Sequence, residues 1–130
     1  MPLIAKFEDI VAWQEARCLS QQIYVLSASG DLARDFGLRD QMRRAAVSAM
    51  TNIAEGFDCD SPKEFARFLE IARRSAVEVQ SLLYVALDAA YIDQPTFQQH
   101  YAQANKTKAL IGGFRHSLLK RIKPEGMPDT

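Results

Sequence analysis

The sequence lacks most of the features that mark a specialised class of protein. It has only two cysteines, Cys18 and Cys59, which are too few for a disulfide framework and are typical of a reducing compartment. No apolar run approaches the ~18 residues that a membrane-spanning helix needs, and the first residues do not resemble a signal peptide. We therefore expect a cytoplasmic protein with no membrane partner.

An excess of charge of either sign is also missing. The 16 basic residues are balanced by 16 acidic ones, so the formal net charge is zero. Bulk charge thus predicts no polyanion partner, and only a local basic patch could attract one. Apolar residues make up 48% of the chain and charged residues 25%, an ordinary globular composition that argues against disorder. With 130 residues, we expect one domain that spans residues 1–130.

Histidine, a common metal ligand and general acid or base, is scarce. The two histidines, His100 and His116, would lie ~24 Å apart along a straight helix, which argues against a shared metal ion. The chain has neither the Glu-x-x-His pair of di-iron bundles nor a glycine-rich phosphate loop. Cys59 has no evident catalytic partner. We expect no enzymatic activity, no metal and no cofactor.

Apolar residues recur at helical spacing along most of the chain, and no useful length alternates as a strand would. The pattern predicts four helices, at about residues 9–28, 38–55, 62–90 and 95–122, and a disordered tail over 123–130. Because the connections are short, the natural architecture is an all-α, antiparallel, up-and-down four-helix bundle.

Glycine, proline and serine mark the expected helix ends. Gly30 is predicted to stop the first helix and Gly56 to cap the second. Ser61, Pro62 and Glu64 form a capping box at the start of the third. Two adjacent glycines, 112 and 113, interrupt the fourth helix, and they predict a bend or a close approach of another helix.

The second helix carries a polar stripe bordered by apolar surface. The stripe comprises Gln41, Ser48, Asn52 and Glu55, and on a helical wheel the last three fall within about 40° of Gln41. It could face water, form an internal hydrogen-bond network, or be a ligand or catalytic site; we favour a structural role. A carboxylate in the last turn opposes the helix dipole, so we expect a cation beside Glu55, with Arg44 and Arg115 as candidates.

The segment QMRRAAVSAMTNIAEGF, followed by SPKEFARFLEIARRSAVEVQSLL, resembles the four-helix bundle proteins encoded in intervening sequences of 23S ribosomal RNA genes. The start, FEDIVAWQEA, is similar to the opening of that family, and the resemblance covers about residues 7–92. Two sets of residues match its signature positions: Gln41, Arg44, Ser48, Asn52, Glu55 and Gly56, then Phe65, Phe68, Leu69, Ala72 and Ser75.

The resemblance implies an all-α bundle that assembles into a ring of five subunits, without a settled biochemical activity. It also relates the chain to the accessory variability proteins of diversity-generating retroelements, pentameric bundles that bind nucleic acid and a reverse transcriptase. Self-association as a homopentamer, RNA or DNA binding, and binding of another protein are therefore the partner hypotheses. A ring needs two different, complementary faces on each subunit.

Basic residues cluster despite the zero net charge. No acid lies between residues 106 and 123, which hold Lys106, Lys108, Arg115, Lys120, Arg121 and Lys123. Two further pairs are Arg39 with Arg43 and Arg73 with Arg74. Each of these residues could instead be a solubilising charge or the partner of a nearby acid. In a ring, however, modest patches would add up, because phosphate contacts sum through counterion release.

The residues predict a non-enzymatic scaffold or adaptor that could bind nucleic acid through basic surface, and the resemblance implies that it is oligomeric. The first alternative is a protein-only interaction module whose basic groups serve internal pairing. The second is a small-molecule or hydrolytic site around Glu55 and Asn52.

Overall fold

The computed structural model describes residues 4–122, and this part of the chain is helical without strands. It contains a short 3-10 helix, η1 (Phe7–Asp9), and five α-helices: α1 (Val11–Leu26), α2 (Gly30–Arg34), α3 (Phe36–Phe57), α4 (Pro62–Asp88) and α5 (Gln94–Arg121). The all-α prediction is thus confirmed, with α2 as an additional short helix. The predicted tail over 123–130 lies outside the described residues.

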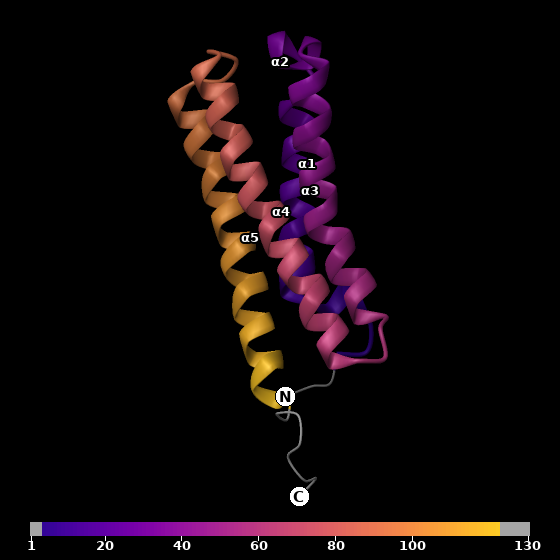
Figure 1. Cartoon of the computed structure of the whole chain (residues 1–130). Coiled ribbons are helices and arrows are strands. Elements are labelled where there is room, and N and C mark those ends of the chain that lie inside the picture. The colour runs from indigo at the N-terminus through magenta and orange to yellow at the C-terminus, as the bar shows by residue number, and fades with distance from the viewer. Residues whose placement is uncertain (1–3, 123–130) are drawn as a thin grey trace, which may run out of the picture.

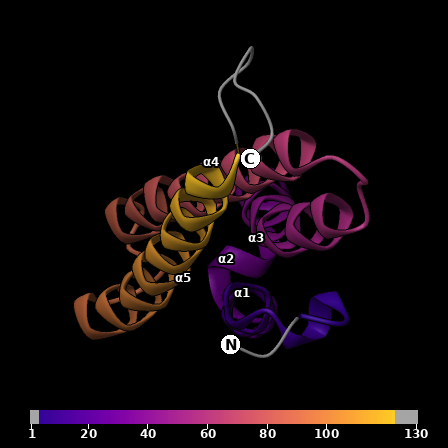
Figure 2. The same ribbon diagram turned by 90° about the horizontal axis from the view of Figure 1, so that it is seen from below.

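The four long helices pack lengthwise against one another. Helix α3 contacts α1 and α4, and α5 contacts α4 and α1. Figure 1 shows α1 and α3 on one side and α4 and α5 on the other, with α2 at the end where α1 leads into α3. The view along the helices shows the same two pairs (Figure 2). Every long helix therefore has two long neighbours that can cover its apolar face.

The core consists of two clusters of buried apolar side chains. One lies toward the α2 end and includes Met42 and Leu83, both fully buried. The other lies toward the α3–α4 connection and includes Ile53, Leu69 and Ile111, which are also fully buried. Burial of such side chains is the main favourable term in folding, worth ~1.5–3 kcal/mol each.

Side-chain caps fix the starts of three of the long helices, α3, α4 and α5, whereas α1 has none. The Ser61 hydroxyl accepts a hydrogen bond from the Glu64 amide at 3.4 Å, and Pro62 is the first residue of α4. The Glu64 carboxylate pairs with Arg67 at 3.1 Å and does not bond to the Ser61 amide, so only the serine half of the predicted capping box forms. Two caps that the sequence reading did not name are Asp35 for α3 and Asp93 for α5.

The roles predicted for Gly30 and Gly56 are wrong. Helix α1 ends at Leu26, and Gly30, with a φ of +69°, begins α2 instead of stopping α1. Gly56 is buried inside α3, which ends one residue later. A Cβ atom there would lie 2.7 Å from the Phe68 Cβ atom. Gly56 therefore does not cap α3 but permits close contact between α3 and α4.

Helix α5 passes through both of its glycines without interruption. The nearest atom to a Cβ built at Gly112 is the Arg73 Cδ atom at 3.7 Å, an ordinary van der Waals distance. Nothing lies within 4 Å of a Cβ built at Gly113. The close helix approach predicted for this pair is therefore wrong.

Candidate nucleic-acid interface

The centre of the polar stripe forms a hydrogen-bond network between α3 and α4. The hydroxyl groups of Ser48 and Ser75 lie 2.8 Å apart, and the Asn52 amide donates to the Ser48 hydroxyl at 3.0 Å and to its carbonyl oxygen at 2.9 Å. Ser75 also lies 3.0 Å from the Ile71 carbonyl oxygen. These partners satisfy polar groups that are half-buried or buried, so this part of the stripe has a structural role.

The ends of the stripe are exposed to solvent. Gln41 reaches the Glu78 carboxylate of α4 at 3.5 Å, a weak contact. Arg44 and Glu55 make no ion pair within the described residues. Arg115, the other cation considered for Glu55, donates to the Ala66 carbonyl oxygen at 3.0 Å. An exposed carboxylate is stabilised by water, so Glu55 does not require the cation that the sequence predicted.

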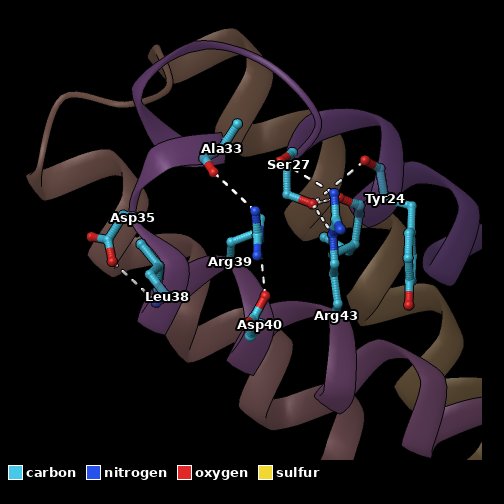
Figure 3. A network of polar contacts seen from close by, with 9 residues as sticks. Tyr24, Ser27, Ala33, Asp35, Leu38, Arg39, Asp40 and Arg43 are labelled. Atoms are coloured by element: carbon cyan, nitrogen blue, oxygen red, sulfur yellow. Dashed lines mark hydrogen bonds and ion pairs between the residues drawn. The ribbon is translucent and has the colours of Figure 1, made fainter.

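Arg39 and Arg43 are committed to structural contacts at the α2 end (Figure 3). The Arg43 side chain donates to the Ser27 hydroxyl at 2.8 Å and to the Ser27 carbonyl oxygen at 3.3 Å, and it lies over the Tyr24 ring. Arg39 donates to the Ala33 carbonyl oxygen at 3.1 Å. Both side chains thus tie α3 to the segment between α1 and α3.

Lys106 belongs to the contact between α1 and α5. Its ammonium group lies 3.0 Å from the Glu15 carboxylate, which also accepts a hydrogen bond from Gln103 at 2.8 Å. The Gln103 hydrogen bond and then Lys106 hold the pKa of Glu15 below its usual value. Lys108 is half-buried on the same helix. Lys106 is therefore a weak candidate for binding phosphate.

Arg74 and Arg115 both line a cleft between α4 and α5. Its volume is about 360 Å³, and its lining comprises Lys63, Ala66, Arg67, Glu70, Ile71, Arg74, Arg115 and Leu119. We call it the basic cleft, because four of these residues are cationic and one is acidic. Sequence analysis did not single out Lys63 and Arg67. Their spacing from Arg74 places all three on one side of α4, a signal that a helical wheel contains.

The one acid in this lining is already neutralised. Glu70 pairs with Arg73 at 2.6 Å, and that hydrogen bond is the main reason why the pKa of Glu70 lies below its usual value. The charges of Arg115 and Arg74 act in the same direction. Lys63 and Arg74 are exposed and make no ion pair within residues 4–122. The cleft therefore keeps an excess of positive charge.

The remaining basic candidates lie toward the end of α5. Lys120 and Arg121 are exposed in its last turn, and Lys123 lies outside the described residues.

Guanidinium groups match the geometry of phosphate oxygens and can donate two parallel hydrogen bonds to them. The chemistry of the basic cleft is thus that of an anion site suited to phosphate.

Two features bear on other classes of function. No helix in the described part of the chain is long and apolar enough to cross a membrane. Among residues 4–122, no group of three or more histidine, cysteine, aspartate or glutamate side chains is placed to hold a metal ion.

These features define a small all-helical protein with a polar contact between α3 and α4 and a basic cleft between α4 and α5. Residues 8–113 match the sequence model of the 23S rRNA-intervening sequence protein family, and the chain therefore belongs to this family. A comparison with curated proteins gives no match.

A solved structure shares the fold. It is that of a protein with unknown function from the S23 ribosomal protein family of Bacteroides thetaiotaomicron VPI-5482. The two chains are 19% identical, with a TM-score of 0.73, and the similarity covers 80% of this chain and 97% of that one.

Proposed function

We propose that this protein is a non-enzymatic, cytoplasmic scaffold that binds the phosphate backbone of RNA or DNA through the basic cleft. The observation that carries the proposal is the cleft itself, whose single acid, Glu70, is neutralised by Arg73. Of its four cations, Lys63 and Arg74 make no ion pair within the described residues, whereas Arg67 pairs with Glu64 and Arg115 donates to the Ala66 carbonyl oxygen. Binding of this kind depends on charge and shape and reads no base sequence.

The proposal includes the architecture and the assembly. We propose that the four long helices form an antiparallel up-and-down bundle and that the subunits associate as a homopentamer. The resemblance to pentameric proteins supports the assembly, and the lengthwise packing of α1, α3, α4 and α5 supports the bundle. In a ring, five basic clefts would present one extended field to a polyanion.

The first test measures binding of a short single-stranded RNA by fluorescence anisotropy at several salt concentrations. We expect wild-type binding at low salt that weakens as salt rises. The double variant Lys63→Gln, Arg74→Gln should bind roughly tenfold more weakly, since each lost contact with an exposed cation is worth ~0.2–1 kcal/mol. The slope of log K against log salt should fall by about 0.7 for each lost phosphate contact.

The matched control removes two exposed arginines outside the basic cleft, in the double variant Arg17→Gln, Arg34→Gln. It has the same net charge as the cleft variant and should bind RNA almost as well as the wild type. Equal losses in both variants would show that RNA responds to total charge and not to the cleft. No binding by the wild type at low salt would rule out the nucleic-acid role.

A protein-only interaction module is the second candidate, and exposed apolar side chains favour it. Val25 is 70% exposed, Phe36 62% and Val11 56%, values that are high for large apolar residues. The protein-only module would be supported if the wild-type protein assembles but does not bind RNA. The hydrolytic alternative has less support, because Asn52 bonds to Ser48 and the Glu55 carboxylate has no hydrogen bond within the described residues.

A further inference from the structure

A second hollow lies where the start of α1 faces the C-terminal half of α5. Its volume is about 850 Å³, within the ~300–1,000 Å³ typical of small-molecule sites. Apolar side chains line most of it, among them Ile10, Phe57, Phe65, Phe114 and Leu118. We call it the apolar groove. A concave, mostly apolar site between helices is the usual setting for a ligand with an apolar body.

Gly113 leaves one wall of the groove open. It lies inside α5, where glycine is less favourable to helix than alanine. No positive φ requires glycine here, and a Cβ at this position would meet nothing within 4 Å. Its lack of a side chain therefore serves neither a turn nor a helix contact. The effect that the structure does show is space in the apolar groove.

The polar groups of the groove indicate the charge of the ligand's polar end and where it would lie. Arg121 and Ser117 line it from the same side of α5, one helical turn apart. Arg121 is exposed and makes no ion pair within residues 4–122. Asp9 also lines the groove, from η1, and its carboxylate would repel an anion. An anionic group is therefore favoured at the α5 side.

From this arrangement we propose that the apolar groove binds a free long-chain fatty acid. The acyl chain lies against Phe57, Phe65 and Phe114, and the space at Gly113 admits it to the groove. The carboxylate lies beside the Arg121 guanidinium, with the Ser117 hydroxyl as a second donor. This proposal does not depend on nucleic-acid binding. Both sites use α5, but no residue lines both the apolar groove and the basic cleft.

The single tryptophan of the chain provides an intrinsic signal. Trp13 is buried in the same core cluster that Phe57, Phe65 and Phe114 pack against. We expect palmitate, titrated below its micellar concentration, to change the Trp13 fluorescence in a saturable way. Gly113→Leu should weaken palmitate binding at least tenfold, since displacing about two methylenes from the groove loses ~0.8 kcal/mol each.

Two further comparisons separate a ligand site from a structural effect. Arg121→Gln should weaken palmitate binding about threefold, as loss of an exposed charge contact does, and should leave hexadecanol binding unchanged. Gly112→Ala is the control for placing a side chain on the glycine pair of α5, because its Cβ atom lies beside Arg73 and Gly112 does not line the groove. It should keep the wild-type affinity, and circular dichroism should show that all variants are folded.

Absence of saturable palmitate binding to the wild type would overturn the proposal. So would wild-type affinity in Gly113→Leu, or equal losses in Gly112→Ala and Gly113→Leu. A groove covered by a second copy of the chain gives its own result: Gly113→Leu lowers the solution mass and palmitate does not bind. The RNA titration reports on the basic cleft separately, so either proposal can fail while the other stands.

Discussion

At the scale of single residues, one alanine has a backbone conformation that is unfavourable for its side chain. Ala90 has a φ of 62°, in the left-handed region that is unfavourable for residues with a Cβ atom. The amide of Tyr91 bonds to the Ala86 carbonyl oxygen and that of Ala90 to the Leu87 carbonyl oxygen, both at 2.9 Å. This is the Schellman pattern, in which glycine is the usual residue at the left-handed position.

Ala90→Gly should therefore stabilise the protein. Glycine adopts the left-handed conformation without the Cβ penalty, and part of that gain is offset by the greater freedom of glycine in the unfolded chain. We expect a net gain of about 0.5–1 kcal/mol in the free energy of unfolding, measured by urea denaturation. Ala89→Gly is the control. Ala89 has a helical φ of −77°, so glycine there should destabilise, and equal effects at both positions would contradict the argument.

At the scale of elements, the contact between α3 and α4 depends on one missing side chain. A Cβ atom at Gly56 would lie 2.7 Å from the Phe68 Cβ atom and 2.8 Å from the Phe65 ring. The Phe68 Cβ atom is bonded to the backbone, so it can move only if α4 moves. Farther along the same contact, the Ser48–Ser75 hydrogen bond fixes the register of the two helices.

Gly56→Ala should thus destabilise the protein even though alanine favours helix. Overpacking of this kind typically costs ~1–3 kcal/mol, more than the ~1 kcal/mol that alanine gains in helix propensity. Thermal unfolding followed by circular dichroism measures the result. Gly37→Ala is the matched control in the same helix. Its nearest contact, Asp35 Oδ1, lies at 3.9 Å, so a melting temperature at or above that of the wild type is expected. Unchanged stability in Gly56→Ala would refute the close-contact explanation.

At the scale of the whole molecule, charge is distributed unevenly although it sums to zero. Residues 1–60 hold nine acids and six bases, a net of −3, so the remaining residues carry the opposite charge of +3. The acids of the first part include Asp58 and Asp60 at the start of the α3–α4 connection, and the basic cleft lies on α4 and α5. Head-to-tail assembly joins two different faces, and unlike charges favour such contacts.

Static light scattering tests the proposed assembly directly. We expect a solution mass close to that of five chains at physiological salt, independent of protein concentration over the range in which a closed ring is stable. A closed ring stops growing, whereas an open head-to-tail chain gains mass as concentration rises. A monomer at every concentration would contradict the pentamer, and a mass that increases continuously would indicate an open filament.

Much of the fold follows from local sequence, because helix formation depends on neighbouring residues. The spacing of apolar side chains predicts long helices, and Ser61 with Pro62 marks the start of α4 where the structure has it. The family resemblance, which the match over residues 8–113 confirms, also rests on contiguous segments. Asp35 and Asp93 are also present in the sequence, but only the local geometry distinguishes these two caps from ordinary surface acids.

The helical class, the family and the set of basic residues follow from the amino-acid sequence alone. Which of those cations stay free depends on how the helices pack, because a cation is held when a residue distant in sequence becomes its partner. Arg43 is held by Ser27 and Lys106 by Glu15, whereas Arg74 faces the basic cleft. The role of Gly56 was decided in the same way, since no local pattern states how close α4 will lie.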